Sequence, residues 1–139
     1  MIHVAAAVCI RDGKVLLASR PENKPPAGWE FPGGKLEKGE DVFAAAKREL
    51  IEELGFKVHP EKILYVKRSD SLILHFVRCT PEPGSTPRAR ENQQFKWVTL
   101  SEKPAGLLDN DREFWEFLCR EQEKFCTNIE NLSGINKIN

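Results

Sequence analysis

The chain has no excess of charge of either sign. Its 139 residues include 21 lysines and arginines and 21 aspartates and glutamates, so the formal net charge is zero and the pI is about 6.8. Proteins that bind long nucleic acids normally carry a basic surplus, because lysine and arginine neutralise the phosphates. We therefore expect no polynucleotide partner.

Cysteine is scarce and scattered. The four residues, Cys9, Cys79, Cys119 and Cys126, form no CxxC pair and no cysteine and histidine spacing that suits zinc. A small protein held together by disulfides or by structural zinc usually shows such a pattern. We expect free thiols in a reducing compartment.

Long apolar runs are missing as well. The N-terminal stretch MIHVAAAVCIRDGK is short and is soon broken by Arg11, Asp12 and Gly13. We therefore expect neither a signal peptide nor a membrane span, and a cytoplasmic location. The length suits about one domain. Because the sequence turns polar after Glu121, we expect a domain over residues 1–126 and a polar tail over residues 127–139.

The pattern of apolar residues predicts strands that come mostly as hairpins. Residues 2–10 and 14–19 flank the turn Asp12-Gly13, a pairing typical of a β-hairpin. Residues 63–68, 71–79 and 94–99 also resemble strands, whereas the proline-rich stretches over residues 20–28 and 81–90 resemble loops. One central and one terminal helix complete an α+β protein with a mixed sheet flanked by helices.

The central helix is the best defined element. Asp41 is a plausible N-cap and Gly55 ends the helix, while Phe43, Ala46, Leu50 and Leu54 recur at helical spacing. This apolar stripe lies roughly 100° around the helix from the acidic residues Glu49, Glu52 and Glu53. The helix is therefore expected to bury one stripe and to present the acids beside it. A second helix is expected to begin near residues 109–111.

Three carboxylates at positions i, i+3 and i+4 of one helix repel each other. Such a face is either solvated, as most glutamate-rich helices are, or bound to a divalent cation. Hard oxygen ligands suit Mg²⁺ or Mn²⁺, with substrate phosphates and waters completing the shell. Gly33 and Gly34 precede the helix and leave room for a close approach of the backbone.

The segment GKLEKGEDVFAAAKRELIEELGF, residues 34–56, decides between these interpretations. It resembles the Nudix box, G-x5-E-x7-R-E-U-x-E-E-x-G-U with U apolar, and agrees with it at every position. The resemblance implies an α/β/α sandwich and Mg²⁺- or Mn²⁺-dependent hydrolysis of a nucleoside diphosphate linked to another group. It implies that Glu49, Glu52 and Glu53 are metal ligands, with Arg48 orienting them, the Gly33 carbonyl as a further ligand and Glu40 as a supporting residue.

Outside the box, the first hairpin and WEFPGGK are similar to the MutT-type subgroup, which converts oxidised dGTP to the monophosphate and pyrophosphate. That resemblance implies that Glu91 joins the metal site, and a solvated loop acid is its alternative. It implies base contacts from Arg20 and Phe31, although Phe31 could equally belong to the core. Gly34 is expected beside the phosphates.

Asn110 fits the position at which the subgroup reads the base. An amide can donate to O6 of 8-oxoguanine and accept from its N7 hydrogen, which guanine lacks. A helix cap is the alternative role for Asn110. The expected activity is a nucleoside triphosphate pyrophosphohydrolase acting on 8-oxo-dGTP. The alternatives are CTP or dCTP, another nucleoside-diphosphate-linked substrate, and a Nudix-fold module that binds nucleotide without cleaving it.

Overall fold

The chain folds around a mixed β-sheet that is flanked by helices. The computed structural model describes residues 1–20, 27–90 and 93–121. In these residues the sheet has seven strands in the order β3-β2-β1-β6-β5, with β4 paired to β1 and β7 paired to β2. The strands are β1 (Ile2–Arg11), β2 (Lys14–Ser19), β3 (Trp29–Glu30), β4 (Gly33–Lys35), β5 (Val58–Arg68), β6 (Leu72–Pro81) and β7 (Phe95–Thr99).

The centre of the sheet is the parallel pair of β1 and β6, while the other pairings are antiparallel. The predicted hairpin is confirmed: β1 and β2 meet at Ile10↔Val15, and Asp12 and Gly13 both have positive φ in the turn. β4 lies antiparallel to the first half of β1, with Gly33 opposite Ala6. This pairing brings the glycines to the middle of the sheet.

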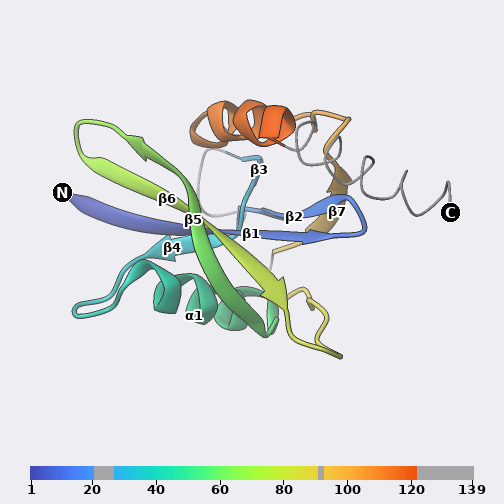
Figure 1. The fold of residues 1–139 in the computed structure, drawn as a ribbon, viewed down its shortest axis with the longest axis horizontal. Helices are drawn as coiled ribbons and strands as arrows, with labels where there is room; N and C mark the ends of the chain where they lie inside the picture. Colours follow the sequence, from blue (N-terminus) through green and yellow to red (C-terminus); the bar gives the residue numbers. More distant parts are fainter. Residues whose placement is uncertain (21–26, 91–92, 122–139) are drawn as a thin grey trace, which may run out of the picture.

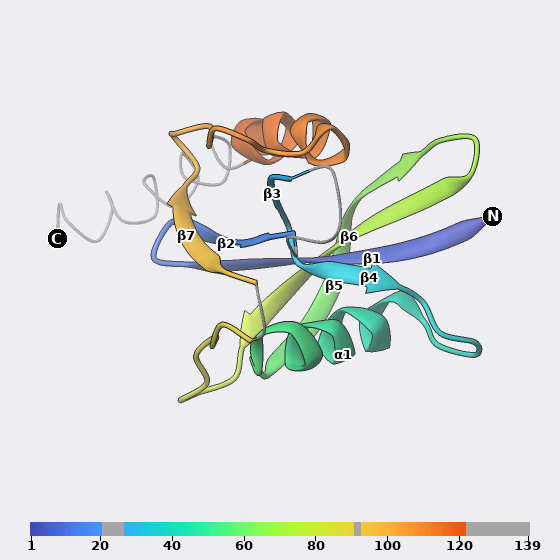
Figure 2. The ribbon, with the colours of Figure 1, turned by 180° about the vertical axis from the view of Figure 1, so that it is seen from behind.

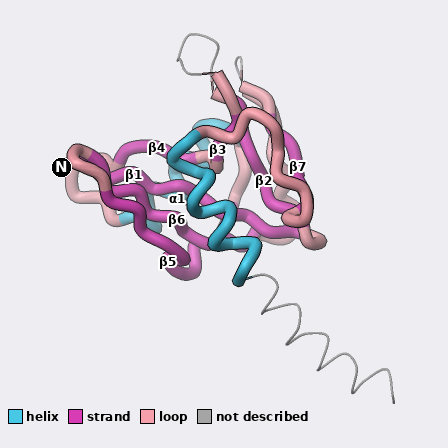
Figure 3. The backbone as a smooth tube through the Cα atoms, turned by 90° about the horizontal axis from the view of Figure 1, so that it is seen from above, coloured by secondary structure: helices cyan, strands magenta, loops and turns pink. Residues whose placement is uncertain are grey.

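Two helices cover the two faces of the sheet. α1 (Val42–Leu54) lies on one face, and a helix over residues 109–121 lies on the other (Figure 1). The view from behind shows the same three layers (Figure 2). From above, the 109–121 helix lies between β5 and β6 on one side and β2 and β7 on the other (Figure 3). The predicted α/β/α sandwich is confirmed.

The alternation of side chains along β1 builds two cores. Ala5, Ala7 and Cys9 face α1, whereas Ala6 and Val8 face the 109–121 helix. Small residues at these positions let α1 approach the sheet, where Leu50, Leu54, Phe56 and Val77 complete the first core. The second core is aromatic and includes Phe31, Phe76, Phe114 and Trp115. Burial on both faces explains why β1 is a nearly continuous apolar run.

The predicted ends of α1 are correct, but one predicted core residue is wrong. Asp41 accepts a hydrogen bond from the Ala44 N–H at 2.8 Å, and Gly55 caps the C-terminus with a φ of 56°. Ala46, Leu50 and Leu54 are buried as expected, whereas Phe43 is 36% exposed. At the start of α1 the buried side is formed by Ala45 and Ala46, with Val42 packed against the same core, and Phe43 lies outside it.

Several strand boundaries also differ from expectation. The two short strands β3 and β4 were not predicted, and β5 begins at Val58 rather than at Ile63. β5 includes Pro60 beside an irregularity in its pairing with β6. Proline is tolerated there because β5 is an edge strand. Residues 21–26 of the expected loop and the expected tail lie outside the described residues. No helix in the described ranges is long and apolar enough to cross a membrane.

Candidate active site

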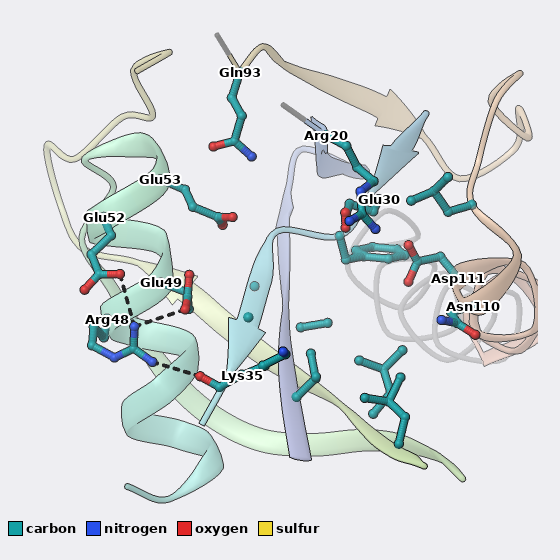
Figure 4. A pocket seen from close by; sticks show the side chains of 18 of the residues that line it. Arg20, Glu30, Lys35, Arg48, Glu49, Glu52, Glu53, Gln93, Asn110 and Asp111 are labelled. Carbon is teal, nitrogen blue, oxygen red and sulfur yellow. Dashed lines mark hydrogen bonds and ion pairs between the residues drawn. The ribbon is translucent and has the colours of Figure 1, made fainter. Parts of the chain in front are cut away.

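A cavity of about 750 Å³ lies between α1 and the start of the 109–121 helix (Figure 4). One end is lined by the acidic face of α1 and the other by Leu108 and the first turn of the second helix. Val4, Ala6, Leu72 and Leu74 form an apolar part of its wall. The polar and aromatic lining consists of Arg20, Glu30, Phe31, Gly33, Gly34, Lys35, Glu37, Arg48, Glu49, Glu52, Glu53, Gln93, Asn110 and Asp111.

Arg48 organises the acidic end of the cavity. Its guanidinium donates to both oxygens of Glu40, at 2.7 and 2.8 Å, and to the backbone carbonyl of Lys35 at 3.1 Å. Its Nη1 also lies 3.0 Å from Glu49 and 3.1 Å from Glu52. Arg48, with help from the Glu37 N–H, lowers the pKa of Glu40 to about 2. Glu40 therefore keeps its charge and holds Arg48 in place.

The two inner acids of α1 are less well compensated. Burial raises the pKa of Glu49 above its ordinary value, against the opposing effect of Arg48. Burial, with the charge of Glu49 second, raises the pKa of Glu53 to about 8. Oε2 of Glu53 is buried and has no hydrogen-bond partner. Two adjacent, partly buried carboxyl groups with raised pKa values favour a cation between them.

Gly33 and Gly34 sit where side chains cannot fit. A Cβ on Gly33 would overlap the backbone of Ala5 and Ala6 in β1. A Cβ on Gly34 would overlap the carboxylate of Glu49. The Gly33 N–H also acts on Glu53, where it lowers the pKa of the carboxyl group against the effect of burial. Both glycines are thus required by close approaches, the first to the sheet and the second to the acid.

The residues fit a divalent cation. The donor set of carboxylates is the one that Mg²⁺ prefers, and Glu53, whose buried Oε2 has no hydrogen-bond partner, lines the same cavity as Glu49 and Glu52. Within the described ranges, no three histidine, cysteine, aspartate or glutamate side chains already converge at metal-binding distances. Arg48 contacts Glu49 and Glu52, which would turn toward a bound cation.

The opposite end of the cavity contains an unexpected acid. Asp111 is 5% exposed and is the one buried charged residue among those described. Burial, followed by the nearby charge of Glu30, raises its pKa to about 8, although it accepts a hydrogen bond from the backbone of Phe31. At neutral pH its carboxyl group is therefore mostly protonated and presents one donor and one acceptor to the cavity.

Three predicted base-contacting residues lie near Asp111. Asn110 is exposed, lines the cavity and belongs to the first turn of a helix that begins at residue 109, so it is not the N-cap. Phe31 is 3% exposed and packs edge-on against Phe114 at 5.2 Å. It lines the cavity from within the core. Arg20 lines the cavity too, and its Nε is buried without a hydrogen-bond partner.

Other site residues were either missed or are not described. Glu91 lies outside the described residues. Asp111, Glu30, Lys35 and Gln93 line the cavity but were not predicted. Asp111 was expected only at the start of the second helix. Nothing in the sequence distinguishes Gln93 from its neighbour Gln94.

Comparisons with known proteins agree with this geometry. The model of the NUDIX domain matches residues 1–118. A CTP pyrophosphohydrolase of Escherichia coli is 39% identical over 106 residues, or 73% of this chain and 78% of that protein. An oxidized purine nucleoside triphosphate hydrolase of Mus musculus is 29% identical over 119 residues, or 81% of this chain and 76% of the other. The MutT NUDIX hydrolase of Burkholderia pseudomallei is 27% identical, with a TM-score of 0.72 over 83% of this chain and 95% of that one.

The chain therefore belongs to the NUDIX family and is a Nudix hydrolase. Its box acids would hold a divalent cation, which when bound neutralises phosphate charge and activates water. Arg48 contacts Glu40, Glu49 and Glu52, and so fixes the acidic end of the cavity. Lys35 also lines the cavity and adds positive charge to it. These roles together suit cleavage of a phosphoanhydride.

The two glycines give a paired prediction. Gly33→Ala is expected to destabilise the fold by about 1–3 kcal/mol, because its Cβ meets backbone that cannot move. Gly34→Ala is expected to keep the melting temperature but to lower kcat/KM by about 10²-fold, because it displaces only the Glu49 carboxylate. Thermal melts and hydrolysis assays of both variants check this. Equal loss of stability in the two would contradict it.

Proposed function

We propose that the protein is a Mg²⁺-dependent nucleoside triphosphate pyrophosphohydrolase that releases a monophosphate and pyrophosphate, with 8-oxo-dGTP as its preferred substrate. The proposal rests on one observation: the box acids and the buried Asp111 line opposite ends of the same cavity. A nucleotide has the same polarity, with a charged triphosphate at one end and a flat base at the other.

The triphosphate end of the proposal rests on α1. Glu49, Glu52 and Glu53 would hold the metal with the Gly33 carbonyl, and Gly34 leaves space for phosphate next to Glu49. Lys35 supplies positive charge to the same cavity. The metal and Lys35 would offset the charge of the triphosphate.

The base end rests on Asp111 and Asn110. A protonated carboxyl group and an amide each offer an adjacent donor and acceptor. The edge of 8-oxoguanine offers the complement, with O6 accepting and the N7 hydrogen donating. Guanine has an acceptor at both positions, so one buried hydrogen bond is lost. That loss costs about 1–3 kcal/mol, or roughly one to two decades in affinity.

A second candidate is CTP or dCTP. It is favoured by the E. coli relative, which is named for CTP. Cytosine also has a neighbouring acceptor and donor, at N3 and at its N4 amino group, so Asp111 suits this base too. The mouse relative, named for oxidised purine nucleotides, favours the first candidate. The two bases differ in size, so the cavity wall has to distinguish them.

Pyrophosphate release with Mg²⁺ on a substrate panel tests the proposal. The panel contains 8-oxo-dGTP, dGTP, CTP, dCTP, ADP-ribose and a dinucleoside polyphosphate. We expect kcat/KM on 8-oxo-dGTP to exceed that on dGTP by about 10- to 100-fold, because guanine leaves one buried group unpaired. A preference for CTP would select the second candidate. Binding without turnover on every member would indicate a non-catalytic module.

A further inference from the structure

Glu53 differs from the other box acids in its support. Arg48 contacts Glu49 and Glu52 at 3.0 and 3.1 Å, but in the described residues no lysine or arginine forms an ion pair with Glu53. Yet Glu53 is more deeply buried than Glu52, whose side chain is 56% exposed. An acid in this position needs another group to fix its carboxylate.

Gln93 is the side chain that faces Glu53. It lies above Glu53 in the cavity and points toward it (Figure 4). Its amide acts on the Glu53 carboxyl group as a donor that lowers the pKa of Glu53, against the effect of burial. The same amide nitrogen donates to the carbonyl of Ser19, at the end of β2, at 3.2 Å. A primary amide has two hydrogens, which matches these two acceptors.

The backbone around Gln93 is itself held in place. The Gln94 N–H donates to Oγ of Ser19 at 2.8 Å, and the Ser19 N–H donates to the carbonyl of Gln94 at 2.9 Å. The Gln93 N–H donates to the carbonyl of Arg90 at 3.2 Å. The Gln93 side chain is therefore anchored to the end of β2 and lies next to the last turn of α1.

We propose that Gln93 is a positioning residue that holds the Glu53 carboxylate toward the cavity by donating one amide hydrogen to Glu53 and the other to Ser19. It does for Glu53 what Arg48 does for Glu49 and Glu52, but without adding a charge. A neutral donor does not compete with a cation for the Glu53 carboxyl group. The inference rests on the proposed metal-dependent hydrolysis.

Gln93→Met tests the role, with Gln94→Met as the matched control. Methionine keeps the length of the side chain and removes the amide, and Gln94 is an exposed neighbour of the same type. Loss of an outer partner of a metal ligand typically costs 10- to 100-fold. We expect Gln93→Met to lower kcat by about 10- to 100-fold with KM for the nucleotide within about 2-fold. Mn²⁺ binding to the protein without nucleotide, followed by electron paramagnetic resonance, should weaken similarly.

For the Gln94→Met control we expect wild-type kcat and wild-type Mn²⁺ affinity. Wild-type values for Gln93→Met, or equal losses in both variants, would overturn the role. Thermal melts accompany each variant, so that a loss caused by unfolding is recognised.

A measurement on the metal-free protein separates this inference from the proposed function. The side-chain amide protons of Gln93 are followed by ¹⁵N-resolved NMR in the wild type and in Glu53→Gln. We expect the Gln93 amide signals to shift and those of Gln94 to stay. Unshifted Gln93 signals would overturn the inference even if the enzyme is active. If the signals shift but no nucleotide is cleaved, the proposed function fails and the contact stands.

Discussion

Glu52→Gln is expected to lower kcat by at least about 10³-fold while leaving the fold intact. The Glu52 side chain is 56% exposed, and its hydrogen bond to Arg48 at 3.1 Å is its one polar contact among the described residues. Its removal should therefore cost little stability. A neutral amide, however, removes a metal-binding charge, and loss of about 4 kcal/mol of transition-state stabilisation corresponds to this factor.

Glu37→Gln is the matched control for this prediction. Glu37 is a second exposed acid at the rim of the same cavity and lies 3.6 Å from Arg48, but it is outside the acidic face of α1. We expect near wild-type kcat for Glu37→Gln. The measurements are initial rates at saturating Mg²⁺ together with thermal melts. Retained activity in Glu52→Gln would show that the metal lies elsewhere on α1.

The sequence predicts α1 well because its signals are local. Asp41 and Gly55 cap the helix through their own backbone and side-chain preferences, and the box fixes the offsets between them. Phe43 lies on the same angular stripe as Leu50 and Leu54 and was expected in the core. Periodicity gives the direction of a side chain, but not which side of each turn the sheet covers. At the start of α1 the covered side carries Val42, Ala45 and Ala46, so Phe43 is exposed.

The strands that sequence reasoning missed are defined by their partners. β3 and β4 have two and three residues, and β4 is largely glycine, so neither has a propensity signal of its own. They exist because Ala18 pairs with Glu30 and Ala6 pairs with Gly33. These pairings are tertiary contacts. They also set the positions of Phe31 and the two glycines in the cavity.

The base end of the site depends on a single residue of helix register. The expected start of the second helix, residues 109–111, agrees with the observed start at residue 109. One residue turns a side chain by about 100°, so a boundary known to within two residues cannot decide between Asn110 and Asp111. The fold buries Asp111 and leaves Asn110 exposed at the mouth of the cavity.

Asp111 therefore gives the second large prediction. Asp111→Ala is expected to lower kcat/KM on the preferred nucleotide by roughly 10- to 100-fold, because the base loses a buried donor and acceptor. Asp111→Asn is expected to keep most of the activity at pH 7, since an amide also presents one donor and one acceptor there. If the ionised carboxylate were the active form, both variants would lose activity equally.

The pH dependence follows from the raised pKa. The pKa of Asp111 is about 8 in the folded protein against an ordinary value of 3.8, because burial disfavours its charge. Between these two values the folded state therefore retains a proton that the unfolded state releases. The stability that protonated Asp111 contributes to the fold is fully present below about pH 4 and is lost as the pH rises through 8. Asp111→Asn should melt at a higher temperature than the wild type at pH 8, with a smaller difference at pH 4. In the wild type, kcat/KM relative to that of Asp111→Asn should fall above pH 8.

Asn110→Ala serves as the neighbouring comparison. If Asn110 also reads the base, its loss is selective for 8-oxo-dGTP over dGTP, whereas a purely local role in the helix affects all substrates alike. Selective loss in Asn110→Ala together with unchanged selectivity in Asp111→Ala would assign base recognition to Asn110 and leave Asp111 as a buried structural acid. The panel of substrates applied to these three variants separates the two assignments. Burial of an acid lowers the stability of the fold unless the acid gains a partner, and the base of the nucleotide can be that partner. We therefore expect the selectivity between bases to depend on Asp111.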